Sequence, residues 1–305
     1  MPFNPFFKRV FFGPFGLRAG WRLLIFNFIF FFLSEATALL ALWIMGPKDS
    51  EWTPAVFLVG RTASLLIAFF SVWLMAKIER RSFLSYGLTR ERASLGLFFE
   101  GSLWGILSIS VVVLLIRLFG GYSIRGVSLH GREILLFAAV WALAFFIASL
   151  FEELVFRGYD LFTLESGIGF WPAAVVLSLF FGFVLHFAMK PGETWVDGLS
   201  VSLIGLFFCL TVRRTGNLWF AIGWHFAFNF GSLFLYGFPN TGNKGLPLTT
   251  RLFDSSVQGP AWLTGGPMGA EASAFVFPMI ALLFLAFHLR FRVVKYRSLR
   301  NSPKN

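Results

Sequence analysis

The chain has 305 residues, of which 57% are hydrophobic and only 13% are charged. A soluble domain carries about 25% charged residues, so this composition excludes an ordinary soluble protein and indicates a membrane protein. The net charge of +11 does not indicate a nucleic-acid partner, because the basic residues lie between hydrophobic stretches and form no soluble basic domain. The single cysteine, Cys209, excludes a disulfide framework.

Eight hydrophobic stretches are predicted to cross the membrane as helices, a task that takes roughly 18 apolar residues. They are residues 21–45, 54–77, 94–118, 133–156, 171–189, 197–212, 217–237 and 271–291. The fourth is expected to run on toward Leu164. The connection 238–270 is rich in Gly, Pro, Thr and Ser, so we expect an exposed loop there. The predicted fold is an all-α, polytopic transmembrane helix bundle of a multi-pass cell-membrane protein.

The basic residues predict how the bundle is oriented. With both termini in the cytoplasm, 17 Lys and Arg residues fall on cytoplasmic segments and 7 fall on the opposite segments. This excess follows the rule that positive charge stays inside, so both termini are predicted to be cytoplasmic.

Three charged residues stand alone within predicted spans: Glu35, Arg61 and Glu100. Charges at such depth usually pair with one another or face water. We expect these residues to pair across helices as structural partners or to be exposed to water.

Two glutamates and an arginine follow the apolar run of the fourth span, in the stretch FEELVFRGYD. On a helix, Glu153 and Arg157 lie four residues apart and face one another, with the glutamate on the favourable N-terminal side. Glu152 points about 100° away from Glu153 and is left to face a cavity. The alternative interpretation is an interfacial salt bridge where the span leaves the membrane.

Three further polar residues lie in later spans. His186 stands in an otherwise apolar stretch, and His225 and Asn229 lie four residues apart on one helix face. His186 alone is compatible with a satisfied polar group, and the other two with a hydrogen-bonded clamp between helices. Counting 1.5 Å per residue from the inner surface places Glu152, His186 and His225 at depths of about 18, 24 and 12 Å, which helix tilt can bring together. We therefore expect one site.

This set of groups suits the hydrolysis of an amide. A buried glutamate beside a histidine can hold a water and remove its proton. An imidazole and an amide N–H can stabilise the oxyanion of acyl transfer. Alternatively, Glu152, His186 and His225 are candidate ligands of a zinc ion that activates the water. The cofactor is therefore either absent or zinc.

The ordered motifs resemble a known family. EELVFRG at residues 152–158, the later intramembrane histidine, and TGNLWFAIGWHFAFN ending in His-x3-Asn are similar to the CAAX-protease and bacteriocin-processing family of intramembrane proteases. This family is also called CPBP or Abi, and the eukaryotic CAAX prenyl endopeptidase belongs to it. The resemblance covers about residues 133–232. It divides the chain into N-terminal helices 1–132, a catalytic core 133–237, and a region 238–305 with an outer loop, the last helix and a basic cytoplasmic tail.

The resemblance implies a role for each site residue. Glu152 is similar to the glutamate that activates water, Glu153 and Arg157 to its supporting pair, and His186 to the histidine that helps position the water. His225 and Asn229 resemble the oxyanion-stabilising pair. One position departs from the family pattern Phe-x3-His, because Gly182 stands four residues before the histidine. Phe181 can replace the missing aromatic residue if the helix is locally overwound or bulged.

The predicted function is an intramembrane endopeptidase whose partner is a membrane-associated peptide or protein, with or without a lipid group. Two alternatives come from other classes. One is a proton-coupled transporter that uses the intramembrane Glu and His groups as a relay. The other is a non-catalytic membrane immunity or scaffold protein, in which the same groups only clamp helices.

Overall fold

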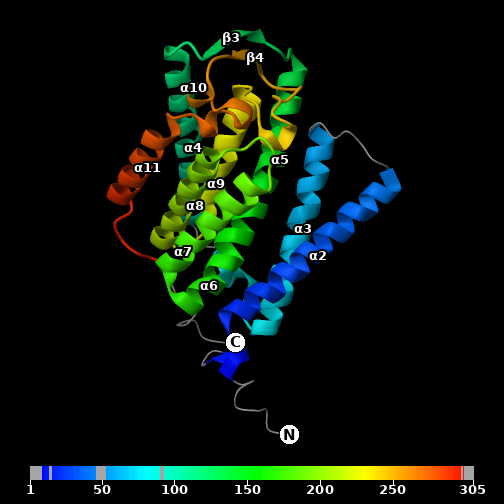
Figure 1. Cartoon of the computed structure of the whole chain (residues 1–305), viewed down its shortest axis with the longest axis vertical. Helices are drawn as coiled ribbons and strands as arrows, with labels where there is room; N and C mark the ends of the chain where they lie inside the picture. The colour runs from blue at the N-terminus through cyan, green and yellow to red at the C-terminus, as the bar shows by residue number, and fades with distance from the viewer. Residues whose placement is uncertain (1–8, 14–15, 46–52, 90–92, 297, 299–305) are drawn as a thin grey trace.

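In the computed structural model, the described residues are 9–13, 16–45, 53–89, 93–296 and 298. They form a bundle of long helices with two small antiparallel sheets (Figure 1). The predicted all-α class is confirmed.

The helices of the bundle follow one another along the chain with short connections. The longer ones are α2 (Ala19–Met45), α3 (Pro54–Glu79), α4 (Ala93–Leu118), α5 (Arg132–Glu153), α6 (Leu161–Ile168), α7 (Phe170–Leu179), α8 (Trp195–Thr215), α9 (Trp219–Asn229) and α11 (Val276–Arg290). Three π-helical segments extend them, namely η2 (Leu154–Asp160), η3 (Phe180–Ala188) and η4 (Phe230–Leu235). The short elements are β1 (Phe12–Gly13), β2 (Gly16–Leu17), η1 (Phe83–Tyr86), β3 (Tyr122–Val127), η5 (Thr241–Asn243), β4 (Phe253–Val257), α10 (Ala261–Thr264), η6 (Gly266–Met268) and η7 (Ala270–Ala272).

Within the described part of the chain, six helices are long and apolar enough to cross a membrane. They are Ala19–Ile44, Pro54–Glu79, Ser94–Leu118, Arg132–Ile168, Phe170–Ala188 and Trp195–Thr215. The fourth continues past Leu164, as predicted. The last two predicted spans correspond to α9 with η4 and to α11, which are shorter. By length and composition, six of the eight predicted spans are therefore present.

Both ends of the described chain meet at one helix. Arg22 of α2 donates a hydrogen bond to Ser166 of α6. Tyr296, near the end of the described chain, donates to the Glu165 carboxylate of the same helix over 3.1 Å. The two ends therefore lie on the same side of the bundle, while their cytoplasmic location stays a prediction. Seven basic residues counted for the orientation lie outside the described residues: Lys8, Lys48, Arg90, Arg92, Arg297, Arg300 and Lys304.

Polar residues at the helix starts define where the spans begin. The Thr53 side chain accepts a hydrogen bond from the Val56 N–H at the start of α3, where Pro54 supplies a fixed φ. At the start of α8, Thr194 and Asp197 form a capping box, in which each side chain bonds the other's backbone N–H. The charge of Asp197 within a predicted span thus has a structural role as a helix cap.

Small residues bring α4 and α9 into close contact. A Cβ added to Gly101 or Gly105 of α4 would lie 2.2–2.3 Å from a backbone oxygen of α9, and one added to Gly223 of α9 would meet the Phe98 carbonyl at 2.1 Å. Glycines spaced four apart let membrane helices approach backbone to backbone. Helix α4, from the region without a family resemblance, thereby fixes the helix that carries His225 and Asn229.

The connection 238–270 differs from the exposed loop that its composition predicts. β4 pairs with β3 in an antiparallel sheet that covers one end of the bundle (Figure 1). Phe238 and Ala270 are fully buried, and Leu248 is almost so. The segment folds back onto α4 and α9 because its apolar residues pack there, a result that its many turn-forming residues do not reveal.

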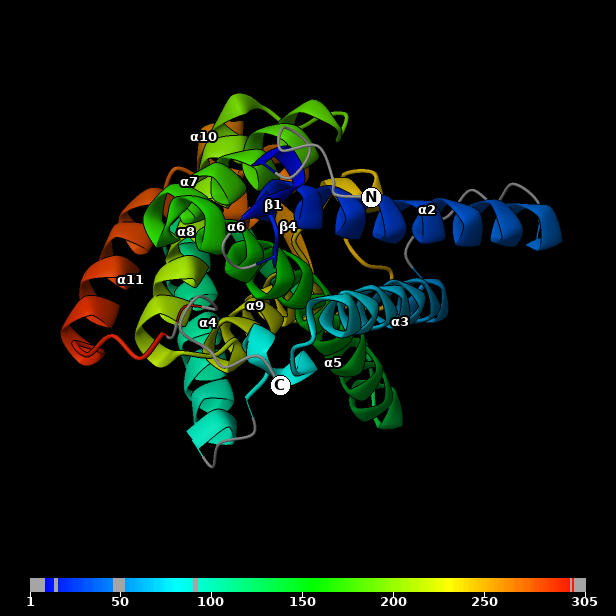
Figure 2. The same cartoon turned by 90° about the horizontal axis from the view of Figure 1, so that it is seen from below.

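Helices α2 and α3 lie on one side of the bundle and diverge from one another along their length (Figures 1 and 2). Their common end is joined to η2 by the buried carboxylate of Glu79. Arg22 donates to it at 2.5 Å, and the Tyr159 hydroxyl donates to it at 2.6 Å. This cluster holds α3 against the helix that carries the two adjacent glutamates.

Candidate functional site

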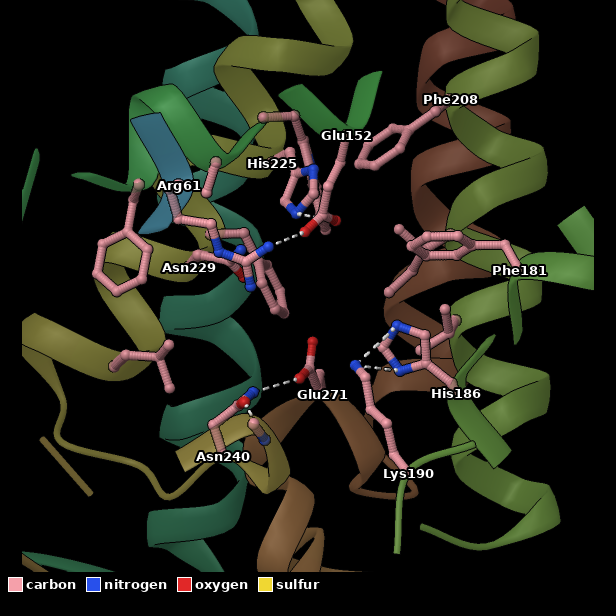
Figure 3. A pocket seen from close by; sticks show the side chains of 18 of the residues that line it. Arg61, Glu152, Phe181, His186, Lys190, Phe208, His225, Asn229, Asn240 and Glu271 are labelled. Atoms are coloured by element: carbon pink, nitrogen blue, oxygen red, sulfur yellow. Dashed lines mark hydrogen bonds and ion pairs between the residues drawn. The ribbon is translucent and has the colours of Figure 1, made fainter. Parts of the chain in front are cut away.

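A pocket of about 150 Å³ opens between α3, α5, η3, α8, α9 and the connection after η4. Its polar side chains lie at two ends (Figure 3). The upper end contains Arg61, Glu152, His225 and Asn229, and the lower end contains His186, Lys190, Asn240 and Glu271.

Glu152 stands in the last turn of α5 and faces the pocket between two cationic or potentially cationic groups. The Arg61 Nη1 atom lies 3.5 Å from Glu152 Oε1, and the His225 Nε2 atom lies 3.8 Å from Glu152 Oε2. The Glu152 side chain keeps 21% of its surface exposed, so its carboxylate is reachable from the pocket. The prediction that Glu152 faces a cavity is confirmed.

Glu153 points away from the pocket and is completely buried. Its Oε1 atom accepts a hydrogen bond from Arg157 Nη1 at 3.2 Å, and it lies 3.0 Å from His225 Nδ1. The predicted pairing of Glu153 with Arg157 is therefore present. Because this carboxylate also binds the ring nitrogen of His225, it fixes the orientation of the imidazole toward Glu152.

Arg157 lies in a space between aromatic rings. Its guanidinium lies 4.9 Å from the centre of the Phe181 ring and 5.2 Å from that of Phe208, distances suited to cation–π attraction. A Cβ added to Gly205 of α8 would come within 2.7 Å of the arginine, so the glycine makes room for it. The cation is thus held by one carboxylate, by rings and by close helix packing.

A π-helical segment lies beside each group of predicted site residues. η2 directly follows the two glutamates, η3 contains His186, and η4 directly follows Asn229. A π-helical turn adds one residue to the α-helical repeat and is frequent at functional sites. The three segments thus change the direction in which side chains around the pocket project from their helices.

The π-helical segment η3 explains the departure from Phe-x3-His. In it, residues five apart share a face, and the Phe181 ring packs 5.1 Å from the His186 ring. Gly182 packs against α8, where an added Cβ would lie 2.1 Å from both the Gly198 oxygen and the Ser202 hydroxyl. The helix is bulged at this point, which is the condition under which Phe181 can replace the missing aromatic residue, and its ring packs against that of His186.

His186 lies at the lower end of the pocket, away from Glu152. Its Nδ1 atom is 3.0 Å from Glu193 Oε2, and Lys190 Nζ lies 3.1 and 3.2 Å from its two ring nitrogens. Among the described residues no hydrogen bond joins His186 to Glu152. The structure brings the histidine to the predicted pocket, while its role in positioning the water stays a prediction.

Two carboxylates beside the lower end differ in their partners. Burial opposes the ionisation of Glu193, but hydrogen bonds from His186 and Thr241 and the nearby positive charges hold its pKa below the usual range. Glu271 lies in η7, outside the candidate spanning helices, and Asn240 Nδ2 donates to its Oε1 at 3.1 Å. Burial raises the pKa of Glu271 to about 7, although Lys190 opposes the rise.

The predicted zinc ligands do not form a metal site. Within the described ranges, no group of three or more His, Cys, Asp or Glu side chains is arranged to hold a metal ion. Glu152 and His225 are neighbours, but His186 bonds to Glu193 and to a lysine ammonium. The donor set therefore does not fit zinc as predicted, and we route no chemical step through a metal.

The three lone charges within the spans do not pair with one another, and Glu35 is exposed, which is the other arrangement expected for them. Arg61 pairs with Glu152, and Glu100 pairs with Arg290 at 3.2 Å. Arg61, Lys190, Asn240 and Glu271 line the pocket but were not predicted as site residues. A lone arginine in an apolar span does signal a need for a carboxylate, but the sequence does not say which one.

Comparison with known families agrees with the resemblance drawn from the motifs. Residues 134–231 match the model of a family described as Type II CAAX prenyl endopeptidase Rce1-like. The match confirms the resemblance over this segment and supports protease activity in a membrane at the level of the family. No curated protein and no solved structure gives a significant match to the chain.

Proposed function

We propose that this protein is an intramembrane endopeptidase that hydrolyses a peptide bond of a membrane-associated protein or peptide. The proposal depends above all on one observation. Glu152 and His225 face each other across 3.8 Å in the pocket, and the other ring nitrogen of His225 is held by buried Glu153. The family match over residues 134–231 supports the same reaction class.

Glu152 is the proposed base. The 3.8 Å gap to His225 is too long for a direct hydrogen bond, so both groups have polar atoms available to a water in the pocket. Glu152 takes a proton from this water as the water oxygen bonds to the carbonyl carbon of the substrate. It then gives the proton to the leaving amine nitrogen as the C–N bond breaks. The products are a carboxylic acid and an amine.

His225 and Asn229 are the proposed donors to the oxyanion that forms in between. His225 Nδ1 lies 3.0 Å from the Glu153 carboxylate and donates to it, so Nε2 can donate only when the ring carries both protons. The Glu153 carboxylate, fixed by Arg157, is the group that compensates this charge. The buried pair therefore positions the histidine, and Asn229 adds an amide donor at the same end of the pocket.

The substrate class follows from the pocket and the family. The pocket of about 150 Å³ is lined by the proposed catalytic groups, so we expect it to hold the residues around the scissile bond. The family description makes a prenylated C-terminal tail the first substrate to test, and an unprenylated peptide of the same sequence is the natural comparison. We propose the cell membrane as the location.

The test uses the full chain reconstituted in lipid vesicles with a prenylated and an unprenylated peptide, and hydrolysis is followed by mass spectrometry of the fragments. Glu152→Gln should lower the rate by about 10²–10⁴-fold, the contribution of a general base. The matched control is Glu133→Gln, which makes the same change at an exposed residue in the first turn of α5.

Full activity of Glu152→Gln would overturn the proposed mechanism. Thermal unfolding in one detergent shows whether each variant is folded, so that a loss of activity can be assigned to chemistry. Proton flux across the vesicles without peptide hydrolysis by the wild type would favour the transporter.

A further inference from the structure

The carboxylates in and beside the pocket are not all paired in the same way. Glu152, Glu153 and Glu193 each have an arginine, lysine or histidine nitrogen within 4 Å. Glu271 has none among the described residues, and its hydrogen bond comes from the neutral amide of Asn240. Carboxylates that are largely removed from water are usually paired with a cation. Glu271 is half-buried in the pocket, so the missing cation needs an explanation.

Glu271 is placed so that a ligand can reach it. It projects into the pocket from η7, with one carboxylate oxygen held by Asn240 and the other directed into the cavity (Figure 3). The hydrogen bond from Asn240 orients the carboxylate without neutralising its charge. This geometry leaves an oriented acceptor facing the space that a substrate would fill.

The nearest lysine of the pocket already has partners. Lys190 Nζ lies 3.1 Å from His186 Nδ1 and 3.7 Å from Glu193 Oε1. Its positive charge acts on Glu271 from a distance, but no ion pair joins the two in the described part of the chain. Lys190 therefore has its partners on the opposite wall of the lower end, and no residue in the described ranges supplies Glu271 with a cation.

We infer that Glu271 is a specificity-determining residue, which binds a Lys or Arg side chain of the peptide substrate close to the scissile bond. This inference rests on the proposed endopeptidase function and names the substrate chemistry of its pocket. A guanidinium or ammonium group that reaches Glu271 forms a charge-assisted hydrogen bond with the free oxygen. The incoming cation thereby offsets the cost of burying the carboxylate, which the unliganded protein leaves uncompensated.

The experiment compares peptides that share one scissile sequence and carry Lys, Arg, Gln or Glu at each neighbouring position in turn. For the wild type, we expect one position at which kcat/KM with Lys or Arg exceeds that with Gln by about tenfold, the effect of a hydrogen bond to a charged group. In Glu271→Gln this ratio should fall to about one, because the isosteric amide carries no charge. In the control Glu133→Gln the ratio should stay at the wild-type value.

Two results would overturn the inference. One is a wild type that prefers no basic residue at any position, which would mean that Glu271 accepts only backbone N–H groups. The other is a preference for basic residues that persists in Glu271→Gln, which would place the cation site elsewhere, for example at Glu152.

A binding measurement separates this inference from the proposed function. In the Glu152→Gln background, fluorescence anisotropy should show about tenfold tighter binding of the Lys peptide than of the Gln peptide, and the added Glu271→Gln change should remove the difference. If the wild type hydrolyses no peptide but this difference is present, the endopeptidase proposal fails and the cation site stands. Equal binding of both peptides overturns the cation site whether or not hydrolysis occurs.

Discussion

The carboxylates at the two ends of the pocket differ in whether they are paired with positively charged groups. At the upper end, Glu153 is fully buried and bonded to Arg157 and His225, and Glu152 lies between Arg61 and His225. At the lower end, the one hydrogen-bond partner of Glu271 within the described part of the chain is the neutral amide of Asn240. The charges of the upper end are paired and fixed within the protein itself, as the proposed catalysis requires. The lower end is left incomplete, as a recognition site requires.

The comparison predicts opposite effects on stability. Arg157→Leu should lower the free energy of unfolding by about 3–5 kcal/mol, because it leaves a buried carboxylate without its cation. Glu271→Gln should leave the melting temperature unchanged or raise it, because it removes a half-buried charge that has no cationic partner among the described residues. Thermal unfolding of both variants in the same detergent measures the difference. Equal losses of stability would show that the two carboxylates are not distinct.

A second prediction concerns catalysis at the upper end. His225→Ala should lower kcat by about 10²–10³-fold, the usual effect of losing one oxyanion donor. The matched control is His130→Ala, since His130 is exposed and lies outside the pocket. Steady-state hydrolysis of one peptide by both variants provides the measurement. A change in KM alone would reassign His225 to substrate binding.

The smallest expected effect is a pH dependence at the lower end. A carboxyl group with a pKa of about 7 is neutral below that pH and ionised above it. The Lys-to-Gln ratio of kcat/KM should therefore rise by up to about tenfold between roughly pH 6 and pH 8, since the lysine itself stays protonated in that range.

The Lys-to-Gln ratio of kcat/KM distinguishes the titration of Glu271 from the titration of neighbouring groups. Lys190, Glu193, His225 and Glu152 all act electrostatically on Glu271. A titration of Glu152 or His225 that alters catalysis changes the hydrolysis of both peptides alike, so it cancels. In Glu271→Gln the ratio should be flat across this range. A ratio that still rises in that variant would assign the titration to another group.

The parts of the site that follow from local helix geometry could be predicted from the sequence. The pairing of Glu153 with Arg157 and the presence of His225 and Asn229 at one end of the pocket need only a repeat of 3.6 residues per turn. The all-α membrane bundle likewise follows from long apolar stretches with few charges. These features depend on residues close together in the chain.

The features of the site that could not be predicted from the sequence depend on contacts between segments far apart in the chain. Arg61 pairs with Glu152 across 91 positions of sequence, and nothing local distinguishes Glu152 from Glu35 or Glu100 as its partner. The sequence places Glu271 at the start of the predicted span 271–291, because an apolar stretch follows it. Its place in the pocket is visible only once the preceding connection is known to fold back onto the bundle.

The π-helical segment η3 also bears on how relatives of this protein can be identified. In an uninterrupted α-helix, an added residue would rotate everything beyond it by about 100° around the helix axis. The wider π turn accommodates the added residue, so the Phe181 ring still packs against the His186 ring. Deleting one residue between Phe181 and His186 would restore the Phe-x3-His spacing of the family and return Gly182 or its substitute to an α-helical register. Alignments of this protein with its relatives should therefore allow a one-residue gap just before the histidine. A pattern with fixed spacing would align Gly182 with the phenylalanine of the family, although Gly182 does not occupy the same place in space.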